Sequence, residues 1–409
     1  MNIRYQLILI LLTPVFIWLT LRHYFHHKDS RYLWQRFFAL KLPTSNHNLW
    51  FHCASVGEVM TLIPLINVYH KKFPDHRFLV TTATITGART CENKLPFVTH
   101  CYLPLDYRGN IKRFIDAMNP DSLIIMETEI WPNLYELSAS NFIPIAIING
   151  RLSSRTTESV PWSKRIFFRA LQHVEHIYCR SEEDKKAFQQ LGAKAHQLEV
   201  IGNLKFSARF SSSASDDIIN IPYVIAASTR DHEEKRIVEL WNKSDHGDLL
   251  LVIAPRHPER KPQILDELKH FNENIKVRSL NQEITNDTTI YLADTLGEMP
   301  ALFSHAAFVI MGGSFVNRGG HNILEPANFS KAILFGPSMH NFESESRLFL
   351  QHKAALQAGN DEAAVNYINQ LIIDKGRREE LGKNAHALIV ENRDIAERYL
   401  DKLAELFED

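Results

Sequence analysis

The sequence predicts an α/β protein with parallel sheets, and three observations support this. Apolar runs of strand length alternate with amphipathic helical patterns along most of the chain. These runs end in charged, glycine or proline residues, which is typical of buried parallel strands covered by helices. A serine-rich polar stretch near the middle of the chain separates two such series. Because ligands bind beyond the carboxyl ends of parallel strands, the residues that follow these runs are the candidates for function.

The predicted strands fall into two groups. The group before the serine-rich stretch comprises residues 49–54, 77–82, 122–126, 143–148 and 176–179. The group after it comprises residues 223–230 (a strand and its loop), 249–254, 289–292, 307–311 and 332–337. Residues 362–409 have the pattern of amphipathic helices. At 409 residues the chain is long enough for two or three domains, each with its own core.

The composition argues against several classes of protein. The net charge is −1, so no basic excess points to a nucleic-acid partner. The four cysteines, Cys53, Cys91, Cys101 and Cys179, form no C-x-x-C pair and lie in or near apolar runs, which favours buried, reduced thiols. Neither H-E-x-x-H, Walker A nor G-x-G-x-x-G occurs. We therefore expect no metal and no cofactor, and neither an ATPase nor a dehydrogenase.

The amino-terminal segment is a candidate membrane anchor. An uncharged, mostly apolar run lies between Arg4 and Arg22, near the short end of the ~17–25 residues that a spanning helix needs. No small-residue cleavage site closes it, so we favour an anchor over a cleaved signal peptide or a buried helix. Basic and aromatic residues follow to position 38, which marks the cytoplasmic side and could also dock on anionic head groups. We predict a single span with the body of the chain in the cytoplasm.

Glu58 is the first candidate catalytic residue. It follows the strand at 49–54 and Gly57, within the first turn of a predicted helix that continues to Tyr69. Such a carboxylate could simply complement the helix dipole. It could also accept a proton from a hydroxyl held nearby. We expect the helix N-terminus to lower the pKa of Glu58 and keep it ionised.

A second pair of carboxylates ends the strand at 122–126. Glu127 and Glu129 follow that strand directly, before Trp131 and Pro132. Two carboxylates so close would repel each other, so a cationic partner or a proton is expected between them. The alternative is a capping cluster, because Thr128 and Glu129 also suit the start of a helix before Pro132.

Residues 312–326 form a glycine-rich stretch after the strand at 307–311. Two glycine pairs lie on either side of Arg318, and Asn322 precedes a predicted helix start. Backbone without Cβ atoms can approach a ligand closely, and a helix N-terminus directs free N–H groups at an anion. The alternative is a tight strand-to-helix connection that needs glycine. We favour a cradle for a phosphate or a nucleotide.

Two cationic residues complete the candidates from pattern alone. Lys205 lies at the edge of the serine-rich stretch, where it is either a solvated lysine or a group reaching across a cleft between domains. Arg256 follows the strand at 249–254, and its guanidinium matches the oxygens of a phosphate. The neighbouring His257 is more typical of a hydrogen-bonded structural histidine.

Seven motifs together resemble those of the Kdo transferases. These are glycosyltransferases of lipopolysaccharide assembly that attach 3-deoxy-D-manno-oct-2-ulosonic acid (Kdo) to a lipid A precursor. In chain order the motifs are residues 55–58, 126–133, 202–206, 227–229, 255–260, 297–299 and 312–326. The resemblance covers nearly the whole chain, and seven motifs in one order are far more specific than any one of them.

The resemblance implies a GT-B fold, in which two Rossmann-like domains face a central cleft. An N-terminal anchor with its basic-aromatic segment would occupy residues 1–38 and an acceptor-side domain residues 39–206. A linker at 207–222 would lead to a nucleotide-sugar domain at 223–409, whose last helix could pack back on the first domain. The implied donor is CMP-Kdo, the acceptor is lipid IVA, and the transfer is inverting and needs no metal. The implied location is the cytoplasmic face of the inner membrane.

The resemblance also implies roles for individual residues. Glu58 is similar to the family's general base, and Glu127 and Lys205 are similar to its transition-state stabilisers. The residues similar to the CMP site are Pro255, Arg256, Gly297, Glu298, Met299, Asn322, Ile323, Leu324 and Glu325.

Two alternatives from other classes remain open. One is another GT-B sugar-nucleotide enzyme, such as a UDP-sugar transferase or an epimerase, which would prefer uridine nucleotides to cytidine nucleotides. The other is a non-catalytic, membrane-bound scaffold of the same fold, against which the strand-end carboxylates Glu58 and Glu127 argue.

Overall fold

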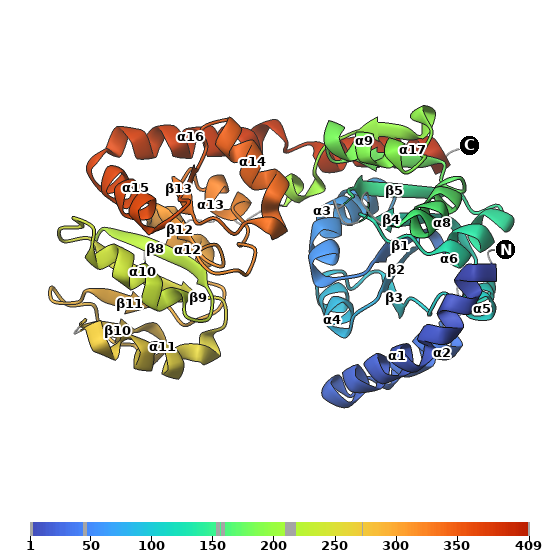
Figure 1. Cartoon of the computed structure of the whole chain (residues 1–409), viewed down its shortest axis with the longest axis horizontal. Helices are drawn as coiled ribbons and strands as arrows, with labels where there is room; N and C mark the ends of the chain where they lie inside the picture. The colour runs from blue at the N-terminus through green and yellow to red at the C-terminus, as the bar shows by residue number, and fades with distance from the viewer. Residues whose placement is uncertain are drawn as a thin grey trace. The chain divides into compact units, whose positions relative to one another are not determined.

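The computed structural model describes residues 3–43, 47–152, 156, 160–208, 218–271 and 273–407. The chain forms two compact units (Figure 1). The first comprises Met1–Ala208 and Arg393–Asp409, and the second comprises Arg209–Asn392. Within the predicted linker at 207–222, residues 209–217 lie outside the described residues.

The first unit is a seven-stranded sheet of order β3-β2-β1-β4-β5-β6-β7. Its strands are β1 (His47–Cys53), β2 (Phe78–Thr82), β3 (Thr99–Tyr102), β4 (Pro120–Met126), β5 (Ile145–Gly150), β6 (His176–Cys179) and β7 (Leu198–Val200). Its helices are α1 (Ile3–His27), α2 (Ser30–Phe38), α3 (Val56–Lys72), α4 (Ile85–Lys94), α5 (Arg108–Met118), α6 (Pro132–Ser140), α8 (Pro161–Leu171), α9 (Glu182–Gln190) and α17 (Ile395–Phe407). Its strand pairs are parallel, and the helices provide the crossover connections that parallel strands need.

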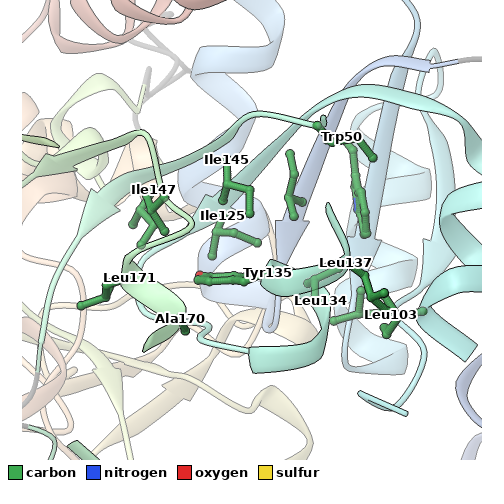
Figure 2. Packing of buried hydrophobic residues seen from close by; sticks show 14 of the residues in the cluster. Trp50, Leu103, Ile125, Leu134, Tyr135, Leu137, Ile145, Ile147, Ala170 and Leu171 are labelled. Atoms are coloured by element: carbon green, nitrogen blue, oxygen red, sulfur yellow. The ribbon is translucent and has the colours of Figure 1, made fainter. Parts of the chain in front are cut away.

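Side chains from the central strands fill the space between the sheet and the helices on one of its faces. Figure 2 shows Ile125 of β4 and Ile145 of β5 above Tyr135 of α6, with Trp50 of β1 in the same layer. Each of these four side chains is fully buried. Burying an aromatic or large aliphatic side chain contributes roughly 1.5–3 kcal/mol, so this layer holds the strand ends in fixed positions.

The second unit repeats the architecture with the order β10-β11-β9-β8-β12-β13-β14. Its strands are β8 (Tyr223–Thr229), β9 (Leu250–Pro255), β10 (Ile275–Val277), β11 (Ile290–Leu292), β12 (Val309–Met311), β13 (Ile333–Phe335) and β14 (Leu356–Gln357). Its helices are α10 (Glu233–Asn242), α11 (Lys261–Leu268), α12 (Met299–His305), α13 (Leu324–Asn328), α14 (Glu343–Gln351), α15 (Asp361–Ile373) and α16 (Lys375–Glu391). Its strand pairs are also parallel.

The predicted fold class, two Rossmann-like sheets of parallel strands, is confirmed. The ten predicted strands all occur, with ends displaced by a few residues. Four further strands, β3, β7, β10 and β14, were not predicted, and each lies at an edge of its sheet. Edge strands are short and partly exposed, so they lack the continuous apolar run that marks a buried strand. The four cysteines are buried and free, as expected.

The first two helices lie side by side in the first unit (Figure 1). Helix α1 contains a segment, Arg4–His26, that is long and apolar enough to cross a membrane, and it is the one such segment among the described residues. Helix α2 begins after Asp29, whose side chain accepts a hydrogen bond from the amide of Arg31. This cap is typical of a helix N-terminus.

Candidate active site

In the first unit, the connections diverge between the neighbouring strands β1 and β4. From β1 the sheet runs through β2 to β3 on one side, and from β4 through β5 to β7 on the other. Such a switch point leaves a crevice beyond the carboxyl ends of the two strands, which is where ligands bind in this architecture. Glu58 follows β1 and Glu127 follows β4, so the topology brings two of the predicted catalytic residues to one place.

Glu58 is held in the first turn of α3 by hydrogen bonds to residues at the end of β1. Ser55 is the N-cap, and its hydroxyl accepts a bond from the Glu58 amide at 3.4 Å. The Glu58 carboxylate accepts bonds from the Ala54 amide at 2.7 Å and the Ser55 hydroxyl at 2.9 Å. This reciprocal arrangement resembles a capping box. Glu58 therefore has a structural role in starting α3, and its carboxylate still has lone pairs free for another donor.

The expectation that Glu58 has a lowered pKa is wrong. Burial raises the pKa of Glu58 from 4.5 to about 7, against the opposing effects of the Ala54 amide and the Ser55 hydroxyl. The carboxylates of Glu127 and Glu129 raise it further. Desolvation and like charge thus outweigh the helix terminus. The result is a carboxyl group that changes its protonation state near neutral pH, which suits a general base.

Glu127 has the cationic partner that the sequence predicted. Its carboxylate Oε2 lies 2.6 Å from Nε of Arg151, which follows β5. The amide of Glu127 donates to the carbonyl of Ile148, and its φ is 57°, in the left-handed region. A non-glycine residue in this region is strained, and such strain often accompanies function.

Glu129 is the third carboxylate of this cluster. It accepts a hydrogen bond from the indole of Trp131 at 3.0 Å, and burial raises its pKa. The positive charge of Arg36 in α2 lowers the pKa of Glu129. Arg36 reaches inward, where its Nη1 donates to the carbonyl of Leu103 at 3.1 Å. Arg36 was not predicted as a site residue, because it lies within a run of basic and aromatic residues that is typical of an exposed segment.

The alternative reading of residues 126–133 as a capping cluster is not what the structure shows. Helix α6 begins at Pro132, and neither Thr128 nor Glu129 caps it. Asp106 does so instead, accepting bonds from the amides of Asn133 and Leu134 at 2.9 and 2.8 Å. The carboxylates of Glu127 and Glu129 therefore do not cap α6, and they remain beside the end of β4.

Lys205 lies in the first unit, on the short 3-10 helix η2 (Leu204–Ser207). Helix η2 packs against α3, the helix that begins with Glu58. Its position is fixed from two sides. The Leu204 amide donates to Asn149 Oδ1 at 3.0 Å, and the Ser207 hydroxyl accepts a bond from the Ala396 amide at 2.9 Å. The last helix, α17, thus contributes to holding the segment that carries Lys205.

Tyr399 of α17 is the centre of this support. Its hydroxyl accepts a bond from the Asn149 amide at 3.1 Å and donates to the Gly202 carbonyl at 3.0 Å. We expect Tyr399→Phe to lower the free energy of unfolding by about 1–3 kcal/mol, because the buried Asn149 amide loses its acceptor. Urea denaturation measures this. Tyr178→Phe, which removes only a 3.4 Å bond to the Lys402 carbonyl, should cost less. An equal loss in both variants would contradict this role for Tyr399.

In the second unit the connections diverge between β8 and β12. The glycine-rich stretch follows β12, and Arg230 follows β8. The glycines are needed for packing. A Cβ atom on Gly312 would lie 2.6 Å from the Ser228 carbonyl oxygen, and Gly313, Gly319 and Gly320 have positive φ. Replacement of these glycines would strain the backbone.

Several amides of the predicted anion cradle are bonded to groups of the protein itself. The carboxylate of Glu233, at the start of α10, accepts bonds from the amides of Gly313 and Phe315 at 2.6 and 2.9 Å. Gly319 donates to the Ser338 hydroxyl and Gly320 to the Gly313 carbonyl. A buried carboxylate of the protein thus occupies the place expected for a bound anion.

The cationic site lies instead around His321. Arg230 donates from Nε to His321 Nε2 at 3.0 Å, and its Nη1 lies 2.8 Å from Nε2 of His257. Burial lowers the pKa of Arg230, and the charges of Arg256 and Arg318 lower it further. Burial and the arginines also lower the pKa of His321 to about 4, so this imidazole is neutral. Three guanidinium groups therefore lie close together, with Arg318 paired to Asp231 at 3.5 Å, and their combined charge suits an anion.

The predicted CMP-site residues divide between two parts of the second unit. Burial raises the pKa of Glu325, and the positive charge of Arg256 lowers it. Because Arg256 also lowers the pKa of His321, Arg256 and Glu325 belong to the part of the unit around His321. Asn322 accepts a bond from the Leu324 amide at 3.1 Å, at the start of α13. Glu298 instead pairs with Arg278 at 2.8 Å, beside Gly297 and Met299 at the start of α12. Pro255 ends β9, directly before Arg256.

Some features of the second unit were beyond prediction from the sequence. Arg230 and Glu233 showed no distinctive pattern, and nothing marked His321 within the glycine-rich stretch, because their roles depend on contacts between segments far apart in the chain. A cavity of about 780 Å³ lies beside the glycine stretch, lined in part by Ser314, Asn317 and Arg347. Among the described residues, no group of three His, Cys, Asp or Glu side chains could hold a metal ion.

Comparison with known proteins gives a consistent picture. Residues 31–208 match the family described as 3-deoxy-D-manno-octulosonic-acid transferase (kdotransferase). A protein of that name from Rickettsia bellii is 32% identical, over 100% of both chains. The protein of the same name from Haemophilus influenzae is 31% identical, over 87% of this chain and 86% of its own. A probable mitochondrial one from Arabidopsis thaliana is 32% identical over 72% and 70%.

Solved structures with a similar fold are more distant in sequence. The UDP-GlcNAc 2-epimerase of Neisseria meningitidis is 14% identical, with a TM-score of 0.60 over 88% of this chain and 100% of its own. A glycosyltransferase from Rickettsia africae is 13% identical, with a TM-score of 0.60 over 89% and 98%. At this level of identity the likeness concerns the fold alone, and it agrees with the GT-B architecture.

Proposed function

Because the chain belongs to the 3-deoxy-D-manno-octulosonic acid (Kdo) transferase family, we propose that it transfers Kdo from CMP-Kdo to lipid IVA, with Glu58 as general base. The observation that carries the proposal is the environment of Glu58. Its carboxyl group lies beyond β1 at a switch point, beside two other carboxylates, with a pKa of about 7. A base whose pKa lies near the working pH is ionised in about half of the molecules, and it is strong enough to take a proton from a hydroxyl.

In the proposed reaction a sugar hydroxyl of lipid IVA attacks the anomeric carbon of Kdo. As the new C–O bond forms, Glu58 takes the hydroxyl proton, and the bond between that carbon and the CMP phosphate oxygen breaks. CMP leaves with the bonding electrons, and configuration at the anomeric carbon is inverted. The transition state has oxocarbenium character, as in other glycosyl transfers.

Two further residues of the first unit would stabilise this transition state. Glu127 supplies a negative charge near the strand end, where its pairing with Arg151 keeps the carboxylate in place. Lys205 supplies a positive charge from η2, which α17 supports. Preorganised charges of this kind act without reorganisation during the reaction, which is why they contribute strongly to catalysis.

The second unit would hold CMP. The proposed phosphate ligands are Arg256 and Arg230, with the amides at 321–323 before α13. Glu325 is half-buried beside Arg256 and could accept bonds from the ribose hydroxyls. Pro255 and the segment at 297–299 are the candidates for contacts with the base. We place the protein at the cytoplasmic face of the inner membrane, held there through its N-terminal helix.

Mass spectrometry of the lipid product tests the proposal. The purified chain, incubated with CMP-Kdo and lipid IVA, should increase the mass of the lipid by one or more Kdo units. A lipid of unchanged mass, under conditions where the chain is folded, would contradict the proposed function.

Nucleotide binding separates the donor from that of other GT-B enzymes. We expect CMP to bind more tightly than UMP or UDP, measured by calorimetry. Tighter binding of the uridine nucleotides would favour a UDP-sugar enzyme.

A further inference from the structure

One face of helix α1 is bonded to the first unit. Near its start, the hydroxyl of Tyr5 donates to Oδ2 of Asp106 at 2.7 Å. Asp106 is 2% exposed, and it is the same carboxylate that caps α6 through the amides of Asn133 and Leu134. The start of α1 is therefore attached to a group on which the folding of α6 depends.

The contacts of α1 continue along the helix. Gln6 Nε2 donates to Asn133 Oδ1 at 2.6 Å, and the Thr13 and Tyr107 hydroxyls lie 2.6 Å apart. The Tyr107 hydroxyl also donates to the Leu9 carbonyl at 3.2 Å. These bonds join the first half of α1 to polar groups of α6 and of the loop before α5.

The second half of α1 contacts α2 instead of α6 and the loop before α5. Thr20 is 3% exposed, and Nδ1 of His23 lies 3.4 Å from the hydroxyl of Tyr32 in α2. At 100° per residue, Tyr5, Leu9, Thr13, Thr20 and His23 fall within about 80° of one another around the helix. The attached residues thus form one stripe that runs along nearly all of α1.

The opposite face of α1 is apolar and exposed. Leu7, Leu11, Trp18 and Phe25 are 55%, 76%, 58% and 71% exposed, and they fall within about 40° of one another. Trp34 and Phe38 of α2 are also exposed, at 40% and 48%. An apolar surface of this extent needs a covering partner.

Exposed cations accompany the exposed tryptophans of this apolar surface. The guanidinium of Arg22 lies 5.5 Å from the ring centre of Trp18, and the ammonium of Lys41 lies 4.9 Å from that of Trp34. Lys28 lies between the two helices and is also exposed. Tryptophan and basic residues together are typical of the head-group region of an anionic bilayer, whereas a protein partner would not require this combination.

We propose that α1 lies in the plane of the membrane surface instead of crossing the membrane. Its attached stripe stays on the first unit, and its opposite face enters the acyl boundary of one leaflet with Trp34 and Phe38. If α1 crossed the bilayer, its polar partners Asp106 and Asn133 would have to follow it into lipid or be abandoned. Either is costly, because unpaired polar groups are strongly unfavourable in hydrocarbon.

The length of α1 supports the same arrangement. With the residues up to Thr13 attached to α6 and the loop before α5, residues 14–27 would span about 21 Å, against a hydrocarbon core of ~30 Å. The remaining part of the helix is therefore too short to cross alone.

This arrangement would bring the bilayer close to the carboxylate cluster. The outer face of α2 carries Trp34 and Phe38, and its inner face carries Arg36, which acts on Glu129. One helix would thus separate the head groups from the cluster. This last step rests on the proposed function, since only a lipid acceptor gives it a purpose.

Depth measurement on the full chain tests the proposal. Nitroxide labels at Leu7→Cys, Leu11→Cys and Phe25→Cys would be read in vesicles of phosphatidylethanolamine and phosphatidylglycerol. The four native cysteines are buried, which limits background labelling. We expect the same shallow depth at all three positions. Depths that differ by tens of ångströms between Leu7→Cys and Phe25→Cys would overturn the proposal.

Sidedness gives a second measurement that does not depend on activity. In membrane vesicles of known orientation, a membrane-impermeant maleimide should reach Arg4→Cys, an exposed position near the start of α1, from the same side as Glu182→Cys, an exposed position on α9. Labelling from opposite sides would show a spanning helix and overturn the proposal. Because neither measurement uses CMP-Kdo, failure here is distinguishable from failure of the proposed transferase activity.

Discussion

Replacing Glu58 by glutamine should abolish Kdo transfer and make the protein more stable at pH 8. The transfer rate should fall at least about 10²–10⁴-fold, the range that general bases contribute. Glutamine is close in size and can still accept the bond from the Ala54 amide, so the start of α3 should survive. Lipid mass spectrometry gives the rate, and urea denaturation gives the free energy of unfolding.

The gain in stability follows from the sign of the pKa shift. Burial raises the pKa of Glu58 to about 7 from 4.5, so between these values the folded protein binds more protons than the unfolded chain. Stability then falls as the pH rises through this window, and the full penalty applies above pH 7. Removing the charge should recover about 1–3 kcal/mol at pH 8 and nearly nothing at pH 4, since each pKa unit is worth about 1.4 kcal/mol.

The matched control is Glu182→Gln. Glu182 is also a carboxylate in the first turn of a helix of the first unit, but it is exposed and lies on α9. Both activity and stability should stay close to those of the unchanged protein. Normal turnover by Glu58→Gln would show that another group accepts the proton.

The second large effect is expected for Arg256→Ala. This arginine is exposed after the end of β9 and is one of the two guanidinium groups that act on His321. A charge-assisted hydrogen bond to a phosphate contributes about 1.5–3 kcal/mol, so CMP should bind roughly 10–150-fold more weakly. Calorimetry with CMP measures the loss, and the fold of the variant is checked alongside because Glu325 loses the neighbouring cation that lowers its pKa.

Arg377→Ala is the control for that experiment. Arg377 lies on α16 of the same unit and pairs with Glu380 at 2.7 Å, away from the arginine cluster. CMP affinity should not change in this variant. Equal affinity in Arg256→Ala and Arg377→Ala would move the phosphate site elsewhere.

The sequence predicted the central strands of both sheets because they are buried on both faces and read as apolar runs. It did not predict β3, with the sequence Thr99-His100-Cys101-Tyr102, because an edge strand needs no such run. The order of the strands in each sheet could not be predicted either, since pairing between distant segments leaves no local pattern in the sequence.

For the site, the sequence identified the strand-end carboxylates but misjudged how they ionise. The Ser-Val-Gly-Glu spacing predicted that a helix begins next to Glu58. The burial of Glu58 and its proximity to Glu127 and Glu129 could not be predicted, because both depend on β1 lying beside β4. Likewise the glycine stretch was recognised, but the buried Glu233 that occupies its amides comes from another strand-helix connection.

The dependence of kcat/KM on pH tests most directly whether a buried carboxylate titrating near neutrality drives the transfer. With CMP-Kdo and lipid IVA, kcat/KM should rise about tenfold per pH unit up to about pH 7 and then level off, since only ionised Glu58 accepts the proton. The residual activity of Glu58→Gln should lack this limb. A kcat/KM that stays constant from about pH 5.5 to 8 in the unchanged protein would contradict the account.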